Sequence, residues 1–370
     1  MNHLNRTALT AGSAAALIVV AAIVTGSRGL EHFDPALIWY ALGSVLAAFA
    51  AAFRFTVWAQ RPPTRLYFKR GLQLLVTRGP TAFSGEAPDP ARFDGSTGPR
   101  YSSSRTASAP MTLPLSLADG FVAQHFIRRR SVYRWIMHIC LSGGCSLAFA
   151  ITFPLVFGWV HFESFATDAE MYRVRVLGFN AGAFSVHSVR GWLMFNLLNL
   201  SALLVLIGLV MAFGRRLVDA GERAVQTFLE DILPLILISA VTVTGLMLTA
   251  SYKLMAGRGH STLATAHAAG VIALLFYLPF GKLFHLFQRT CGLCVKLYQG
   301  AGAAGPRARC LGCGADYASK MQVNDLKQVL DELGFNYRFA TPLGERHYQD
   351  ICPACRRRLL AVNQGRSVGR

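Results

Sequence analysis

The chain has 370 residues, of which 53% are hydrophobic and only 15% are charged, and its mean hydropathy is +0.37. A soluble enzyme of this length would carry about 25% charged residues. The net charge of +18 would suit a nucleic-acid binder, but such proteins do not carry several uncharged runs of membrane-spanning length. The composition therefore excludes soluble fold classes and predicts an all-α polytopic membrane bundle.

Six apolar runs approach or exceed the ~20 residues that cross a bilayer as a helix. The first two lie within residues 1–60, and the other four form a predicted bundle over residues 131–290. The first run also resembles a short signal peptide, but no clean small-x-small cleavage site follows it, so we expect a retained helix. The predicted spans cover residues 8–27, 35–53, 135–160, 191–213, 232–252 and 265–288.

Basic residues cluster in alternate connections between the spans, and this pattern marks the cytoplasmic side of a membrane. The predicted cytoplasmic connections hold Arg61, Arg65, Lys69, Arg70, Arg128, Arg129, Arg130, Arg134, Arg215, Arg216 and Arg289. We therefore expect a multi-pass protein of the cell inner (cytoplasmic) membrane with both termini in the cytoplasm. The positive charge is then explained by the topology of the chain in membrane lipid, and it requires no nucleic-acid partner.

Residues 61–130 are predicted to form a flexible cytoplasmic loop. The stretch 79–114 within it is rich in Ser, Pro, Gly and Thr, and it carries too few large apolar residues to bury a core.

Histidines in or beside the spans are the first candidates for function, because an ionisable side chain inside a bilayer is costly. His267 and His285 are 18 residues apart, five helical turns, so on one helix they would share a face and lie roughly 27 Å apart. His138 lies at a depth similar to that of His285, ahead of two glycines that favour either close helix packing or space for a flat macrocycle. We expect His138 and His285 to ligate haem b, an imidazole being its usual axial ligand. The alternative is a pair of interfacial histidines bonded to backbone or water.

The partner of His267 is less defined. His187, His161 and His260 all lie near the outer surface, and His187, just ahead of the fourth span, is the chosen candidate. The sequence thus leaves one or two haems open.

The segment Pro279-Phe280-Gly281-Lys282-Leu283-Phe284-His285, with a histidine 18 positions upstream, resembles the last helix of the respiratory nitrate reductase gamma subunit. It is also similar to the cytochrome b subunits of heterodisulfide-reductase-type complexes. That family folds as a five-helix bundle with two b haems, held by two histidines ten residues apart on one helix and two 18 apart on the last. The resemblance covers roughly residues 120–290 and implies that His138 pairs with His285. Ala148 stands where the family places its second early histidine.

The resemblance implies quinol oxidation in the membrane, with electrons passed to iron-sulfur and molybdenum-type oxidoreductase subunits of a respiratory complex. A quinol site requires a proton acceptor and hydrogen-bond donors beside a haem. Lys253, His187, Arg190 and Glu163 are candidates, and each is alternatively an interfacial anchor.

Six of the eight cysteines form three C-x-x-C pairs. Two such pairs on tight knuckles direct four thiolates at one metal ion. Cys310, Cys313, Cys352 and Cys355 therefore predict a small cytoplasmic zinc-ribbon-like domain over residues 306–358, with a helix over 324–334 between the pairs. Zinc is the expected metal, and iron in a rubredoxin-like site is the alternative. A glycine-rich joint at 300–305 is expected to precede the domain, and a basic tail at 359–370 to follow it.

Four cysteines remain outside this set. Cys291 and Cys294 follow the last span directly and would hold a cluster, form a redox dithiol or cap the helix. Cys140 and Cys145 are expected to be small buried apolar residues.

The sequence therefore predicts a membrane b-type cytochrome subunit, the electron-transfer (quinol-oxidising) part of an oxidoreductase, with no catalytic residues for the terminal reaction. The alternative is a haem-free membrane anchor or transporter whose zinc ribbon recruits a partner. A transmembrane signalling protein is a third option, although no kinase, cyclase or DNA-binding segment follows the spans.

Overall fold

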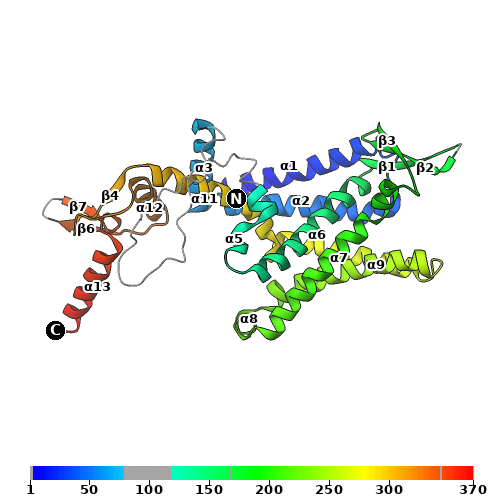
Figure 1. Ribbon diagram of the computed structural model, residues 1–370. Helices are drawn as coiled ribbons and strands as arrows, with labels where there is room; N and C mark the ends of the chain where they lie inside the picture. Colours follow the sequence, from blue (N-terminus) through cyan, green and yellow to red (C-terminus); the bar gives the residue numbers. More distant parts are fainter. Residues whose placement is uncertain (1–2, 79–117, 167, 342–343, 370) are drawn as a thin grey trace. The chain divides into compact units, whose positions relative to one another are not determined.

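The computed structural model describes residues 3–78, 118–166, 168–341 and 344–369 (Figure 1). The chain divides into two compact units. The membrane unit comprises Met1–Val57 and Asp119–Gln288, and the C-terminal unit comprises Trp58–Ala118 and Arg289–Arg370. The predicted flexible stretch 79–114 lies outside the described residues.

Among the described residues, six helices are long and apolar enough to cross a membrane, as expected for a multi-pass membrane protein. The helices are α1 (His3–Gly26), α2 (Ile38–Ala59), α6 (Val132–Val156), α7 (Val189–Val218), α9 (Leu233–Leu254) and α10 (His260–Phe280). Short turns precede two of them, Pro35–Leu37 before α2 and Phe228–Ile232 before α9. Serine caps begin α6 and α7: the Ser131 hydroxyl accepts from the Arg134 N–H at 3.4 Å, and Ser188 accepts from Gly191 at 3.0 Å.

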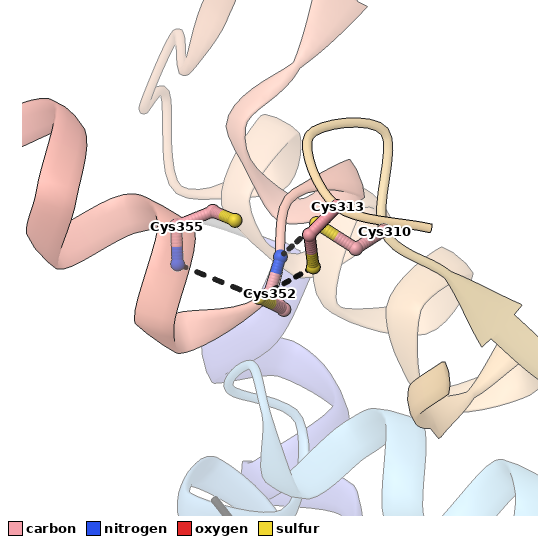
Figure 2. A group of neighbouring side chains, drawn as sticks. All are labelled: Cys310, Cys313, Cys352 and Cys355. Atoms are coloured by element: carbon pink, nitrogen blue, oxygen red, sulfur yellow. Dashed lines mark hydrogen bonds between the residues drawn. The ribbon is translucent and has the colours of Figure 1, made fainter. Parts of the chain in front are cut away.

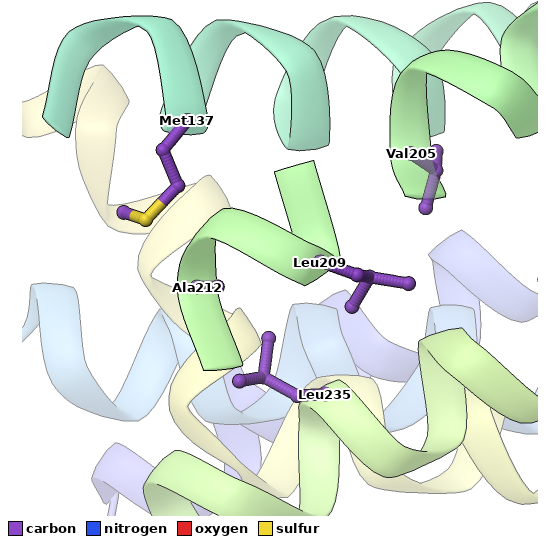
Figure 3. Packing of buried hydrophobic residues seen from close by; sticks show 5 residues of the cluster. All are labelled: Met137, Val205, Leu209, Ala212 and Leu235. Carbon is purple, nitrogen blue, oxygen red and sulfur yellow. The ribbon is translucent and has the colours of Figure 1, made fainter. Parts of the chain in front are cut away.

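The core of the membrane unit lies between α6, α7 and α9. Met137, Val205, Leu209, Ala212 and Leu235 form its buried cluster (Figure 3). Glycines bring α6 and α7 together, because a Cβ on Gly144 would lie 2.9 Å from the Ser201 carbonyl oxygen, and one on Gly208 would lie 2.8 Å from the Leu141 nitrogen. Small residues allow this close approach of helices in a membrane. Gly144 therefore serves helix packing, whereas Gly143 faces open space.

A three-stranded antiparallel sheet connects α6 and α7, so the fold is not all-α as predicted. Its strands, in the order β1-β2-β3, are Val160–Phe165, Asp168–Val176 and Phe179–Ser185. Phe162, Tyr172 and Phe184 form one aromatic cluster with Phe195 of α7. The third span accordingly ends at Val156 rather than at 160, and His161 lies on β1.

The last predicted span is broken. Helix α10 ends at Phe280, a 3-10 turn covers Lys282–Phe284, and a new helix, α11, runs over His285–Ala304. Gly281 is needed at the break, because a Cβ there would lie 2.0 Å from the Tyr277 ring. The expectation that His267 and His285 share one face of a continuous helix is therefore wrong. It failed because apolar residues continue through the Pro279-Phe280-Gly281 break.

The C-terminal unit combines the cysteine domain with two helices that the sequence assigned elsewhere. Helix α3 (Thr64–Arg78) lies inside the predicted loop 61–130. The same predicted loop also contains a helical turn at Ala118–Ala123 and, in the membrane unit, α5 (His125–Arg128). Helix α11 continues through most of the predicted glycine-rich joint. The domain itself contains β4 (Arg307–Arg309), β5 (Asp316–Ser319), α12 (Lys320–Glu332), β6 (Arg338–Thr341), β7 (Gly344–His347), the turn Tyr348–Asp350 and α13 (Pro353–Ser367).

Two details of this domain correct the sequence analysis. The central helix begins at Lys320, because the Ser319 hydroxyl caps it by accepting from the Gln322 N–H at 3.1 Å. The second cysteine pair opens a helix, α13, which continues to Ser367 through most of the predicted tail. A ribbon of two hairpin knuckles is therefore replaced by one knuckle and one helix N-terminus.

Candidate functional site

The four predicted metal ligands lie together. Cys310 follows β4, Cys313 lies in the turn before β5, Cys352 caps α13, and Cys355 is in the first turn of α13 (Figure 2). Their sulfur atoms are all within 4.8 Å of one another. The structure thus confirms that residues 39 positions apart in sequence (Cys313 and Cys352) form one cluster, with their sulfurs 3.8 Å apart.

Backbone amides surround the sulfurs as they do in thiolate metal sites. The Cys310 sulfur accepts from the amides of Gly312 at 3.3 Å and Cys352 at 3.1 Å, and the Cys352 sulfur accepts from Cys355 at 3.4 Å. Burial by itself would raise the pKa of Cys310, but the amides of Cys352, Cys313 and Gly312 outweigh it and lower the pKa to about 6. Hydrogen bonds from the neighbouring thiols raise the pKa of Cys355 to about 12. Four thiolates this close repel one another, so all four ionise only when they share a cation.

The sulfur spacing fits a small tetrahedral metal. Zinc–sulfur bonds of about 2.3 Å in a regular tetrahedron place neighbouring sulfurs about 3.8 Å apart, which is the Cys313–Cys352 distance. The cluster can therefore bind a metal such as zinc.

Contacts around the cluster tie it to α12. Lys327 of α12 donates to the Asp350 carboxylate at 2.5 Å, and the Asp350 carbonyl accepts from the Leu311 amide at 3.0 Å within the knuckle. One ion pair thus connects α12 to the residue that bonds the knuckle.

Helix α12 is held in turn by a buried carboxylate, Asp325, which the sequence analysis missed. Only 2% of Asp325 is exposed, and its two oxygens accept from Arg70 of α3 and from the Tyr298 hydroxyl of α11, each at 2.9 Å. Its partners lie 255 and 27 positions away, so no local pattern signals the interaction.

The histidine predicted on the outer side of the last span, His267, contacts α9. Its Nδ1 lies 3.0 Å from the Thr244 hydroxyl oxygen. The Thr244 hydroxyl also lies 2.6 Å from the Ala240 carbonyl oxygen, to which it can donate. With that bond made, the His267 Nδ1–H donates to Thr244 and Nε2 is the acceptor, which is the form that ligates iron. Thr244 is a further residue that the sequence analysis did not single out.

His285 also has an acceptor at Nδ1. This nitrogen lies 2.7 Å from the Lys282 carbonyl oxygen, which accepts only, so Nδ1 carries a hydrogen. The side chain is exposed at the start of α11. A backbone contact is also what an interfacial histidine makes, so the geometry fits both interpretations given by the sequence.

His138 lies in α6, one turn before Ser142. The Ser142 hydroxyl donates to the His138 carbonyl at 2.7 Å and accepts from the Gln124 side-chain amide at 3.0 Å. Gln124 is 1% exposed, so a polar group from outside the span is buried beside the predicted ligand.

The outer histidines have partners in the sheet region. His187 is exposed after β3, and its Nε2 lies 3.5 Å from a Glu170 oxygen. His161 stacks on His32, with ring centroids 5.1 Å apart, and its Nε2 lies 3.3 Å from Glu163. Hydrogen bonding to Arg175 is the largest cause that lowers the pKa of Glu163. Glu163 is thus an ion-pair partner, the anchoring role given as the alternative to a quinol site.

Another quinol-site candidate, Lys253, has a neutral partner. Its ammonium donates to the Asn196 side-chain oxygen at 3.2 Å, a contact between α9 and α7. This contact also fits the role of an anchor.

Cys291 and Cys294 are buried in α11 against α3, where a Cβ on Gly71 would lie 2.6 Å from the Cys294 Cβ. Burial raises the pKa of both thiols, that of Cys291 to about 11. Neutral thiols in contact with another helix fit packing better than redox or metal chemistry. Cys140 and Cys145 are half-buried in α6.

Comparison with known protein families, with curated proteins and with solved structures finds no match for this chain.

Proposed function

We propose that this protein is a membrane b-type cytochrome subunit that carries electrons between the quinone pool and a cytoplasm-facing iron-sulfur or molybdenum-type oxidoreductase. The observation that carries the proposal is that Nδ1 of both His267 and His285 lies within hydrogen-bond distance of an oxygen that can accept from it. Ligating histidines donate their second ring N–H to a hydroxyl, carboxylate or carbonyl, which fixes the ring and leaves Nε2 for the metal. Thr244 and the Lys282 carbonyl are such acceptors.

Haem b, when bound, supplies a one-electron iron couple. In the proposal His138 and His285 hold an inner haem, and His267 with His187 holds an outer one if a second is present. The protein's own contribution is to fix the rings of His267 and His285 by their Nδ1 contacts with Thr244 and the Lys282 carbonyl. Resemblance to the nitrate reductase gamma subunit family supports the inner pair, and Ala148 leaves the outer pair to residues that the family does not use.

The proposed sidedness rests on where the arginines lie. The start of α6 and the end of α7 are neighbours, since the Tyr133 hydroxyl donates to the Met211 carbonyl at 2.9 Å. Arg130, Arg134 and Arg215 therefore share one end of the bundle, and the acid-bearing sheet lies at the other end of the same two helices. Positive charge favours the cytoplasmic side, which supports cytoplasmic termini in the inner membrane.

The test is a reduced-minus-oxidised optical spectrum of the purified full chain. A b-type signal that is lost or halved in His138→Ala and His285→Ala, but kept in His260→Ala, is the expected result. His260 is the control because it is exposed and is not one of the four predicted ligands. No signal from haem-supplied membranes would refute the proposal.

A haem-free membrane anchor with a partner-recruiting metal domain is the second candidate. The break at Gly281 and the packing of Gly144 against α7 favour it, since both weaken the argument from helix spacing and from space for a macrocycle. In this case the spectrum is featureless, while the metal site still folds and docks a partner.

We assign zinc to the cysteine cluster, with iron as the alternative. Metal analysis of the full chain is expected to find one zinc per chain, lost in Cys313→Ser and kept in Cys140→Ser. A red protein with thiolate-to-iron absorption would instead identify iron and add an electron-transfer centre to the C-terminal unit.

A further inference from the structure

A cavity of about 410 Å³ lies at the end of α7 in the membrane unit. It is lined by Tyr133, Gly214, Arg215, Val218 and Asp219. An aromatic ring, an aliphatic side chain and a bare glycine thus form a wall beside one guanidinium group. Nothing in the proposed electron-transfer function uses this cavity.

The length of α7 indicates that the cavity lies at the depth of lipid headgroups. Helix α7 has 30 residues, a length of about 45 Å, whereas the hydrocarbon core of a bilayer is about 30 Å thick. Apolar side chains remain exposed around this end of the helix, with Val218 82% and Leu217 71% exposed. Val225 of α8 (Ala220–Val225) and the following Phe228 are exposed as well. Exposed apolar residues beside arginines are typical of a segment that lies in the membrane interface.

Two of the acids at this end, Asp219 and Glu222, are already engaged. Asp219 caps α8 by accepting from the amides of Gly221 at 3.0 Å and Glu222 at 3.4 Å. Glu222 forms an ion pair with Arg215. Neither acid is therefore available to balance further arginines.

Several arginines at the same end are uncompensated. The Tyr133–Met211 hydrogen bond brings the start of α6 to the end of α7, and with it the arginines on either side of Tyr133. Arg129, Arg130, Arg134 and Arg223 are exposed and form no ion pair within the part of the chain that the structure describes.

We propose that this cavity binds an anionic phospholipid. The acyl chain would lie over Gly214 and Val218, and the headgroup charge would be balanced by the exposed arginines on either side of Tyr133, Arg130 and Arg134. Basic pockets between transmembrane helices are suited to acidic lipid headgroups. The site is independent of haem, so the optical test above and the lipid test below can fail separately.

The test reconstitutes the full chain in nanodiscs of phosphatidylcholine with 20% phosphatidylglycerol, where the 20% is roughly the charge density of an anionic leaflet. After mild detergent extraction, native mass spectrometry measures the phosphatidylglycerol that stays bound relative to phosphatidylcholine. Enrichment over the bulk ratio is expected for the natural chain. Equal retention of the two lipids would overturn the proposal.

Two glycines give a matched pair of variants. Both Gly214 and Gly143 have no atom within 4 Å of an added Cβ, so neither position crowds the first atom of a new side chain. Gly214→Leu fills the cavity and is expected to abolish the enrichment, whereas Gly143→Leu is expected to keep it. Retained enrichment in folded Gly214→Leu would also overturn the proposal.

Charge variants provide the second measurement. Each basic residue near an anionic surface contributes about fivefold in affinity, so Arg130→Gln with Arg134→Gln should reduce binding of phosphatidylglycerol about 30-fold. Arg258→Gln, at the exposed turn before α10, is the control and should leave binding unchanged. An equal loss of binding in the control would show that overall charge, not a specific site, causes the effect, and would refute the proposal.

Discussion

The contact between α6 and α7 makes opposite predictions for two adjacent glycines. In Gly144→Ala the new Cβ would lie 2.6 Å from Val205 Cγ2, 2.9 Å from the Ser201 carbonyl oxygen and 3.0 Å from the Val205 nitrogen. Carbon atoms in contact prefer about 3.5–4.0 Å, and two of these three neighbours are backbone atoms that cannot rotate away. The helices must therefore separate. In Gly143→Ala nothing lies within 4 Å of the Cβ.

The sizes of two opposing effects decide whether each variant is stabilised or destabilised. Overpacking costs about 1–3 kcal/mol, and replacing glycine by alanine inside a helix returns up to about 1 kcal/mol. Gly144→Ala should thus lose about 1–2 kcal/mol of unfolding free energy, while Gly143→Ala should gain up to about 1 kcal/mol. Unfolding of the full chain in mixed micelles with rising dodecyl sulfate, followed by circular dichroism, measures the difference. Equal midpoints for the two variants would show that α6 and α7 do not approach as closely as described.

Three further predictions concern the polar contacts. Arg70→Met should lower the free energy of unfolding of the C-terminal unit by about 2 kcal/mol, because it leaves the buried Asp325 without its cation. Arg65→Met breaks an exposed pair with Glu332 and should lower it by at most about 1 kcal/mol. Urea unfolding measures both values, and equal losses would contradict the role of burial. Arg175 and His161 lower the pKa of Glu163, so the contribution of Glu163 to thermal stability should be complete above its unfolded pKa and disappear as pH falls through its folded pKa. Below the folded pKa, the natural chain and Glu163→Gln should therefore melt at the same temperature. A difference in melting temperature that stays constant with pH would refute this prediction. Chelation of the bound metal should speed hydrogen exchange in β4 and β5 and leave α6 and α7 unchanged; unaltered exchange in the strands would mean that the cysteines do not stabilise the domain through a metal.

Hydropathy and cysteine spacing were sufficient to predict the parts of the structure that depend on local patterns. Each span is a contiguous apolar run, and the bilayer thickness fixes the length that such a run needs. The two C-x-x-C pairs bring their sulfurs together because a tight turn orients both side chains of a pair, whatever separates the pairs. Neither inference needs knowledge of distant contacts.

The elements that the sequence did not predict lie where apolar residues continue beyond the end of a membrane-spanning helix. Strands β1 to β3 follow α6 directly, and Val160 and His161 read as the end of a span although they pair with β2. Apart from Lys282, residues 277–284 carry no charged side chain across the break at Gly281. The break depends on the Tyr277 ring, which a hydropathy window does not detect. Secondary structure at span ends is therefore decided by side-chain fit.

The burial of Asp325 in the C-terminal unit also depends on side chains that are distant in sequence. In sequence it is one acid near the start of an amphipathic helix, where a solvated position is the usual outcome. The structure buries it because Arg70 and Tyr298 compensate the carboxylate, and a buried charge is tolerated only when it is paired. The unit then contains two centres of different chemistry, the cysteine cluster near α13 and a carboxylate between α3, α11 and α12. Chelation should release the first centre and not the second, so α3 should stay protected in hydrogen exchange when the metal is removed and lose protection in Arg70→Met when it is present.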